Sequence, residues 1–325
     1  MNMKAKSFYI AICMVLVTLI SCRQEEIYTG PCDVRFRAYV QDEVSVTRAN
    51  YTYTTIGSSM PAFTAELFVT NGSQEPLPST LTWNGQTLSS LQLEEGTYNF
   101  YGYMPRQDDA TFDPATLTMH LPAIPGVSGT DAMVVKAKQS PVTIVNTDAP
   151  QWVNLQMDHL MAKVTPRFYL NSTYAQMRSI RIKKVEFGFE EDLTNHQATV
   201  TYSADNSYEV EWSTGEQLPQ TMVVAYENEN PTAILPTVKG EAVEYGCCYL
   251  CPNQPAGNLL MRVTYDVYDT KNECTRSDAV AVNKIKKLSS LTVNAGTDYK
   301  LSIQIVPNYL YALSDNDEEV MVISN

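Results

Sequence analysis

Alternation of apolar and polar residues is the main pattern along this chain. It is clearest in residues 34–40 (VRFRAYV), 261–268 (MRVTYDVY) and 299–305 (YKLSIQI), where every second side chain is apolar. Successive side chains of a β-strand point to opposite faces of its sheet, so this period of two predicts half-buried strands. The apolar face of the first stretch consists of Val34, Phe36, Ala38 and Val40.

Turn sequences separate these stretches. Short strands at such spacing, with no long 3.6-residue pattern between them, predict an all-β protein made of antiparallel β-sandwiches. The best helix candidates are residues 175–184 and 278–291. The four clearest turns are WNGQ at 83–86, EEGTY at 94–98, SADNS at 203–207 and TKNE at 270–273.

A domain boundary is predicted near Asp158. Residues 121–131 (LPAIPGVSGTD) form a loop rich in Pro and Gly, and residues 152–157 (WVNLQM) then have the pattern of a closing strand. A new run of strands begins at residue 159. The two resulting units, residues 49–157 and 158–325, each have the size of one β-sandwich.

The first 21 residues have the character of a signal peptide. Lys4 and Lys6 precede an apolar run of 13 residues, Phe8–Ile20. Crossing the hydrocarbon of a bilayer takes about 20 apolar residues, so this run is too short for a membrane span.

The residues that follow resemble a bacterial lipobox. In Leu19-Ile20-Ser21-Cys22 the thiol of Cys22 would receive diacylglycerol and become the new N-terminus, with acyl chains such as palmitate holding the chain to the outer membrane. Glu25 and Glu26 resemble the surface-export signal of Bacteroidota lipoproteins. The alternative is an ordinary secretory signal in which Cys22 sits by chance.

Composition narrows the choice of partners. The chain of 325 residues carries a net charge of −13, and loss of Lys4 and Lys6 with the signal makes it −15. Such a surface repels phosphate backbones, so nucleic acid is not an expected partner. Apolar residues make up 44% of the chain, which is enough for a substantial core.

The cysteines of the mature chain do not form a recognisable metal site. The cluster CCYLC has no second cysteine or histidine pair at zinc-site spacing. Buried thiols and one or two disulfides both remain open, and the pairing is not determined. The residues concerned are Cys32, Cys247, Cys248, Cys251 and Cys274.

Catalytic motifs are missing from the sequence. His120, His159 and His196 have no G-x-S-x-G nearby, and there is no H-E-x-x-H. His159 has the simpler interpretation of a strand-start residue with a hydrogen bond to make. The acidic clusters 190–192 and 315–319 do not match a calcium loop. A non-enzyme without cofactor or metal is therefore predicted, although a triad assembled from distant residues is an alternative.

Four stretches in order along the chain resemble the fimbrillin-like lipoproteins of Bacteroidales, the subunits of type V pili. They are LTWNG at 81–85, LEEGTYNFYGYMP at 93–105, HLMAKVTPRFYL at 159–170 and VNAGTDYKLSIQIVPNYLYALSD at 293–315. The resemblance implies two transthyretin-like antiparallel sandwiches in tandem. It also implies that subunits polymerise by strand exchange at the cell surface.

The resemblance further implies proteolysis after an arginine near the N-terminus. Arg48, followed by Ala49, lies in a polar segment where cleavage would release residues 22–48 together with the lipid. The released first strand would carry the groove-filling side chains Val34, Phe36, Ala38 and Val40, and another subunit's strand would take their place. Alternatively, Arg48 is an ordinary exposed loop residue.

The leading hypothesis is a fimbrial subunit that adheres to a host or bacterial surface ligand, with stalk, tip and anchor roles all open. One rival is a permanently lipidated surface binding protein, with Trp83 and Trp212 as candidate exposed aromatics. Another is a lipid-anchored hydrolase. The C-terminal stretch EEVMVISN, residues 318–325, either donates a strand to a neighbour or closes its own sheet.

Overall fold

The structure is a computed structural model that describes residues 30–43, 52–57, 60–72, 75–189, 193–203, 205–218, 221–254, 259–285, 293–305 and 321–323. Cys22, Arg48 and Ala49 lie outside these residues. Within them, no helix has the length and hydrophobicity that a membrane span requires.

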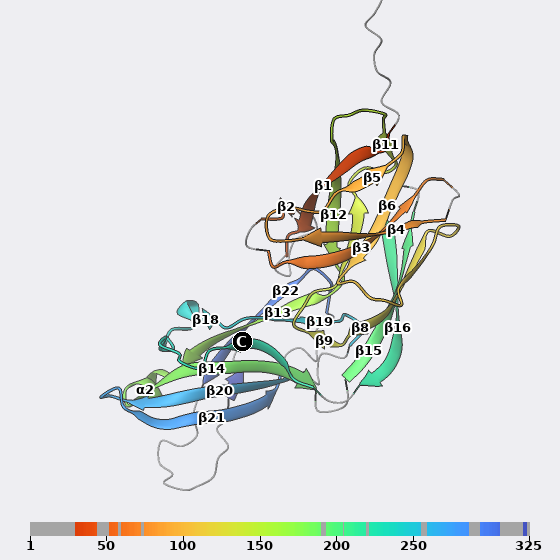
Figure 1. Ribbon diagram of the computed structural model, residues 1–325. Coiled ribbons are helices and arrows are strands. Elements are labelled where there is room, and N and C mark those ends of the chain that lie inside the picture. The colour runs from red at the N-terminus through yellow and green to blue at the C-terminus, as the bar shows by residue number, and fades with distance from the viewer. Residues whose placement is uncertain are drawn as a thin grey trace, which may run out of the picture.

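The predicted all-β class is confirmed, because almost every element is a strand (Figure 1). The largest sheet has nine strands in the order β2-β1-β12-β10-β6-β3-β4, with β5 also paired to β1 and β11 to β6. Its strands are β1 (Cys32–Gln41), β2 (Tyr53–Thr55), β3 (Phe63–Thr70), β4 (Leu77–Trp83), β5 (Leu91–Leu93), β6 (Gly96–Met104), β10 (Met133–Ala137), β11 (Val142–Ile144) and β12 (Gln151–His159).

A six-stranded sheet follows, in the order β23-β22-β13-β19-β9, with β18 also paired to β13. Its strands are β9 (Val127–Ser128), β13 (Ala162–Leu170), β18 (Val243–Glu244), β19 (Cys248–Leu250), β22 (Asp298–Ile305) and β23 (Met321–Ile323). Because β23 pairs antiparallel with β22, the C-terminal stretch closes its own sheet in this structure.

Two four-stranded sheets complete the fold, in the orders β17-β14-β20-β21 and β16-β15-β8-β7. The first contains β14 (Arg178–Phe189), β17 (Val223–Glu227), β20 (Leu259–Asp269) and β21 (Cys274–Lys284). The second contains β7 (Thr111–Asp113), β8 (Thr118–Pro125), β15 (Leu193–Tyr202) and β16 (Tyr208–Leu218). The short helix α2 (Ser172–Ala175) and the 3-10 turn η1 (Lys239–Glu241) are the described helical elements.

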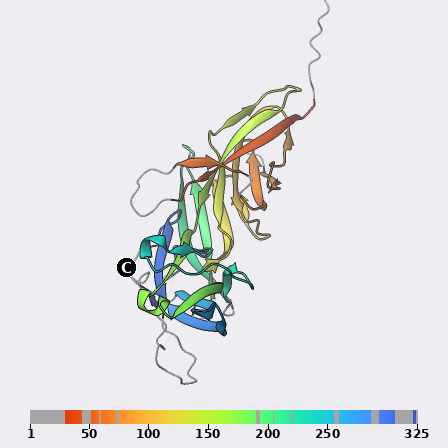
Figure 2. The ribbon, with the colours of Figure 1, turned by 90° about the vertical axis from the view of Figure 1, so that its left-hand side faces the viewer.

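The sheets follow one another along an elongated molecule, with the nine-stranded sheet at one end and β14, β20 and β21 at the other (Figures 1 and 2). Three clusters of buried apolar side chains hold them together. One is enclosed by the nine-stranded sheet itself, with Phe36 and Phe100 among its members, so this sheet curls around its own core. A second joins the opposite face of that sheet to β8 and β15, and a third fills the space between the six-stranded sheet and the sheet of β14.

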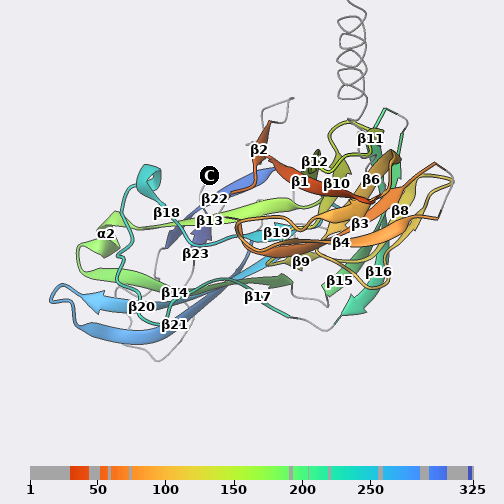
Figure 3. The same cartoon turned by 45° about the horizontal axis from the view of Figure 1, so that its top comes forward.

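The two halves of the chain share sheets. Residues 118–125 of β8 pair with β15, and β9 pairs with β19, so strands on either side of Asp158 lie in common sheets. Two parallel pairs sit at the junction, β1 with β12 and β22 with β13 (Figure 3). Only Leu160 and Met161 separate β12 from β13.

The two helix predictions are wrong. Residues 178–184 belong to β14 and residues 278–284 to β21, both paired with β20. Ile180 and Ile182 of β14 alternate with less buried neighbours, as a strand on a core requires. Pairing and burial against β20 therefore outweigh the helical propensity of these stretches.

The four turns are confirmed. Each lies between consecutive strands or at a strand end, and Gly85, Asn206 and Asn272 adopt the left-handed backbone conformation that their turns need.

The five cysteines of the described chain are free thiols, and Cys32, Cys248 and Cys251 are buried. Of the two alternatives left open by the sequence, the structure therefore has thiols.

Candidate functional site

The first strand, β1, is built into the core of the nine-stranded sheet. Val34 and Ala38 are fully buried, Phe36 is 4% exposed, and Val40 is partly buried against the same cluster. The rings of Phe36 and Phe100 meet edge to face with centroids 5.9 Å apart. Burying a Phe side chain contributes about 1.5–3 kcal/mol, so β1 supplies a large share of the packing in this cluster.

Backbone pairing holds β1 on both sides. Seven residues, Val34–Val40, pair parallel with Gln151–Met157 of β12. On the other side β5 pairs with the start of β1 and β2 with its end. If β1 were removed, one edge of β12 and the apolar interior of the sheet would both open.

Hydrogen bonds between Asp42 and residues 52 and 54 hold together the end of β1 and the start of β2. The Asp42 amide donates to the Thr52 carbonyl oxygen at 2.7 Å, and the Thr54 hydroxyl donates to the Asp42 carboxylate at 2.7 Å. The hydrogen bonds from Thr52 and Thr54 lower the pKa of Asp42. Arg48 lies in the segment between these bonded ends, which places the expected cleavage point between β1 and β2 in sequence.

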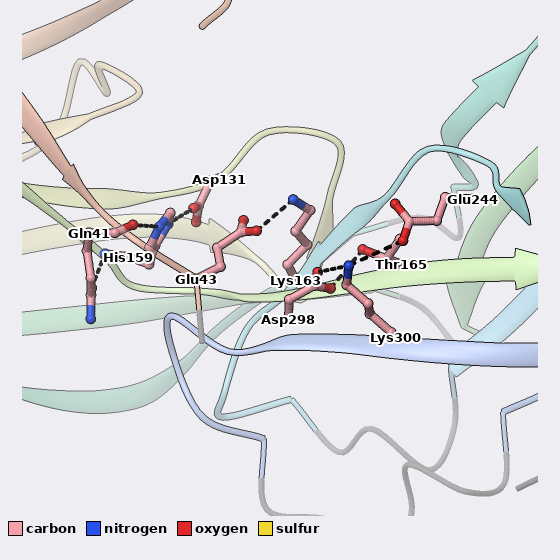
Figure 4. Close-up of polar contacts among 9 residues, drawn as sticks. All are labelled: Gln41, Glu43, Asp131, His159, Lys163, Thr165, Glu244, Asp298 and Lys300. Atoms are coloured by element: carbon pink, nitrogen blue, oxygen red, sulfur yellow. Dashed lines mark hydrogen bonds and ion pairs between the residues drawn. The ribbon is translucent and has the colours of Figure 1, made fainter. Parts of the chain in front are cut away.

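The end of β1 is fastened by a buried histidine (Figure 4). His159, the last residue of β12, places Nε2 2.7 Å from the backbone oxygen of Gln41 and Nδ1 against the Asp131 carboxylate. The His159 amide also donates to the Gln41 side-chain oxygen at 3.1 Å. We call Gln41, Asp131 and His159 the β1 clasp.

The pKa values of His159 and Asp131 in the β1 clasp are both raised. Burial alone would lower the pKa of His159, but the hydrogen bond and charge of Asp131, aided by the Gln41 carbonyl, outweigh it and raise that pKa. Burial raises the pKa of Asp131, and the bond to His159 offsets part of the rise. Both ring nitrogens face oxygen acceptors, so the ring is satisfied when Nε2 carries a proton for Gln41 and a second proton lies between Nδ1 and Asp131. The other carboxylate oxygen of Asp131 is buried without a hydrogen-bond partner among the described residues.

An ion pair extends the attachment into the second half of the chain. Lys163 of β13 donates to the Glu43 carboxylate at 2.7 Å, just beyond the end of β1 (Figure 4). Burial opposes the charged form of Lys163, yet Glu43 outweighs it and raises the Lys163 pKa. Beside this pair, Thr165 donates to Asp298 at 2.8 Å. The end of β1 is thus held by β12, β13 and the loop that carries Asp131.

β2 has an attachment of its own. The Tyr53 hydroxyl donates to Asp158 at 2.8 Å, and the same carboxylate lies 3.4 Å from the Lys136 ammonium. These contacts do not involve β1. They add a side-chain link from β2 to β12 and β10, while the backbone pairing of β2 among the described strands is with β1.

The sequence and the structure differ on several candidate residues. His159 makes the hydrogen bonds expected of it, but it ends a strand rather than starting one. Trp83 is 5% exposed, with its indole N–H donating to the Met60 oxygen, so its assignment as an exposed aromatic is wrong. Trp212 is half-buried against the second core cluster, which corrects its assignment too. The exposed tryptophan is Trp152, at 49%.

The histidines do not assemble a hydrolase site. The side chains of His159 and Asp131 are each 5% exposed, and both ring nitrogens are taken, so the ring offers no free position to a substrate. His196 contacts Gln254 and Asn253, and His120 contacts Thr199. Across the described ranges no three His, Cys, Asp or Glu side chains are grouped as a metal site would require. The acidic clusters 190–192 and 315–319 lie outside those ranges.

Comparison with known proteins gives matches in structure alone. No family model matches the chain, and no curated protein matches its sequence. A candidate cell adhesion protein from Bacteroides fragilis superposes with a TM-score of 0.43 at 12% identity, covering 91% of this chain and 97% of that one. A fimbrial protein from Bacteroides vulgatus gives 0.35 at 12%, covering 90% and 99%.

The fimbrial anchor protein Mfa2 from Porphyromonas gingivalis gives a TM-score of 0.31 at 10% identity, covering 90% of this chain and 97% of that one. At such scores and identities no residue role transfers from these proteins. Solved structures similar to this chain thus include a candidate cell adhesion protein, a fimbrial protein and a fimbrial anchor protein of Bacteroidales.

Proposed function

We propose that this chain is a fimbrial subunit, exported as a lipoprotein on Cys22 and assembled by strand exchange after cleavage between Arg48 and Ala49. The observation that carries the proposal is the position of β1. It is a core strand of the nine-stranded sheet, yet the chain runs from it to the later strands through the segment that contains Arg48. One cut there would separate a core strand from its domain.

The vacated groove suits a donor strand. Departure of β1 would leave unpaired backbone groups along Gln151–Met157 and an open apolar interior. A strand from a neighbour would restore the hydrogen bonds, and alternating side chains at the positions of Val34, Phe36 and Ala38 would set its register. Departure of β1 would also remove the backbone partner of β2, which would keep its side-chain contact between Tyr53 and Asp158, and a donor strand could pair with β2 as β1 does.

The alternative is an anchor subunit or surface binding protein that keeps its lipid and its first strand. The β1 clasp and the pair between Glu43 and Lys163 favour retention, because they fasten the end of β1 to three other segments. Both proposals share outer-membrane attachment through Cys22 and differ in what happens at Arg48.

The test uses soluble protein that begins at Arg23, so that no lipid is attached. Brief treatment with an arginine-specific protease is followed by mass spectrometry of the new N-terminus and by measurement of oligomer size. The Arg48→Gln variant, treated identically, shows whether any cut is specific to that bond. We expect a cut before Ala49 in the original chain and no cut at this bond in the variant.

The outcomes separate the candidate roles. Cleavage with ladders of oligomers supports a stalk subunit that both receives and donates a strand. Cleavage without ladders supports a tip subunit that only receives one. Resistance at Arg48 with a monomeric product contradicts the cleavage proposal and favours the anchor or surface-binding alternative.

A further inference from the structure

A cavity of about 500 Å³ is lined by the middle of β1, and it reaches from Trp152 of β12 to the opposite edge of β1. There β5 pairs only with Cys32–Val34 and β2 only with Tyr39–Gln41, so residues 35–38 have no paired strand on that side among the described residues. The walls come from four places in the chain. They are residues 35–38 of β1, Thr55 and Ile56 at the end of β2, the stretch from the end of β4 towards β5 with Trp83, Gln86, Thr87, Leu88 and Ser90, and Trp152 of β12.

The cavity carries positive charge in an acidic protein. Arg37 lies over the ring of Trp152, with its guanidinium carbon 4.4 Å from the ring centroid. Arg37 has no carboxylate at ion-pair distance within the described ranges, whereas Arg35 is paired with Asp33 at 2.9 Å. The cation–π contact uses the flat face of the Arg37 guanidinium and leaves the N–H groups at its edge available to a ligand.

The rest of the cavity combines an apolar surface with a polar rim. Ile56 and Leu88 are partly buried and contribute apolar surface, and Trp152 is half exposed. The polar rim is formed by Gln86, Thr87 and Ser90.

Hydrogen bonds of Trp83 and Asn84 hold the loop that carries Gln86 and Thr87. The Asn84 side-chain oxygen accepts from the amides of Gln86 and Thr87, both at 2.9 Å. The indole N–H of Trp83 is tied to the Met60 oxygen at 3.2 Å. A ligand would therefore meet a wall that is already ordered, which lowers the entropic cost of binding.

The geometry points to a binding site for a carboxylated sugar of one or two rings in this cavity. A guanidinium binds a carboxylate through paired, charge-assisted hydrogen bonds. The C–H face of a sugar ring can lie against Trp152 and Leu88, while its hydroxyls reach Gln86, Thr87 and Ser90. The volume is that of an ordinary small-molecule site.

The site depends on the first strand. Arg35 and Arg37 both belong to β1, so a chain that has lost β1 lacks the charge that would select an acidic sugar. The site does not depend on cleavage at Arg48, because it is complete in the uncut chain. Failure of the cleavage experiment would leave this proposal standing, and failure to bind sugar would leave strand exchange standing.

The test titrates the uncut chain with galacturonate and with digalacturonate, and with galactose and galactobiose as their neutral counterparts. Binding is followed by saturation-transfer NMR and by tryptophan fluorescence. We expect binding of at least one acidic sugar, preferred over its neutral counterpart. Arg37→Ala should weaken that binding by about tenfold or more, since a hydrogen bond to a charged group is lost. Trp152→Ala should weaken acidic and neutral sugars alike.

Arg178→Ala is the matched control, because Arg178 is also an exposed arginine on a strand, in the distant sheet of β14. It should bind the sugar as the original chain does. Arg37 and Trp152 are both surface residues, and a thermal unfolding curve for each variant confirms that it is folded. Equal binding of acidic and neutral sugars, acidic binding that survives Arg37→Ala, or no binding by the folded chain would each overturn the proposal.

Discussion

His159 Nε2 lies 2.7 Å from the backbone oxygen of Gln41, so the last residue of β12 holds the last residue of β1. This contact joins positions 118 residues apart in the sequence. The acceptor is a backbone atom, so no substitution at position 41 removes it. The imidazole and Asp131 behind it therefore determine the strength of this contact, while the Gln41 side chain adds the bond that it accepts from the His159 amide.

The β1 clasp should weaken as pH rises. The pKa of His159 is raised, so its contribution to stability is complete below about pH 6.5, the value for an unfolded histidine, and is lost as pH rises through the folded pKa. The raised pKa of Asp131 acts in the same direction. The nearby charged groups that influence the ring are Asp131, Asp42 and Glu43.

The measurement is the free energy of unfolding in urea for the original chain and for His159→Gln, which does not titrate. We expect the difference between the two to be largest near pH 6 and to shrink towards about pH 9. A difference that stays constant across this range would show that the pair does not change protonation there.

Asp131→Ala should destabilise the uncut chain by about 3 kcal/mol, because it leaves a buried imidazole without its anionic partner. The control is Asp109→Ala, an exposed aspartate for which a change within about 0.5 kcal/mol is expected. Urea unfolding of both variants provides the comparison. Equal effects would mean that Asp131 does not support the clasp.

Phe36→Ala should cost about 3–5 kcal/mol in the uncut chain, because it opens a cavity beside Phe100. When the variant is cleaved after Arg48 and β1 leaves, its stability should equal that of the cleaved original chain, because the altered strand is no longer part of the domain. Phe187→Ala, in the third core cluster, should destabilise both forms. Loss of stability from Phe36→Ala in the cut form would show that β1 stays bound after cleavage.

Lys163→Ala should change global stability by about 1 kcal/mol or less, because the pair with Glu43 is partly exposed. Its expected effect is local, through faster hydrogen exchange of the amides at the end of β1. Lys183→Ala, which breaks the pair with Asp278 on the sheet of β14, is the matched control. Unchanged exchange at Tyr39–Gln41 would exclude a role for Lys163 in holding the strand.

The sequence predicted the strands well because each carries its own signal. The alternation of Val34, Phe36 and Ala38 shows both that β1 is a strand and which face is buried. The same signal does not identify the neighbour of a strand, so the parallel pairing with β12 and the shared sheet of β8 and β15 were not predictable. Residues 178–184 were mistaken for a helix because only their pairing with β20 defines them.

The site was less predictable than the fold. His159 was identified as a residue with a hydrogen bond to make, but its partners Gln41 and Asp131 are distant in sequence and have no motif of their own. Trp152 gives no sequence signal that separates it from Trp83. One is exposed and the other buried because of the faces that their strands turn outward.

The short connection between β12 and β13 has a mechanical consequence. β1 lies parallel to β12 over seven residue pairs, so a pull along the strand axis loads all of them in shear at once. A donor strand that took the same place and direction in the groove would be loaded in the same way. Only Leu160 and Met161 separate β12 from β13, which is paired in the same parallel manner with β22. In a fibre, tension entering through the groove would pass directly along this central line of strands, while the outer sheets would carry little of the load.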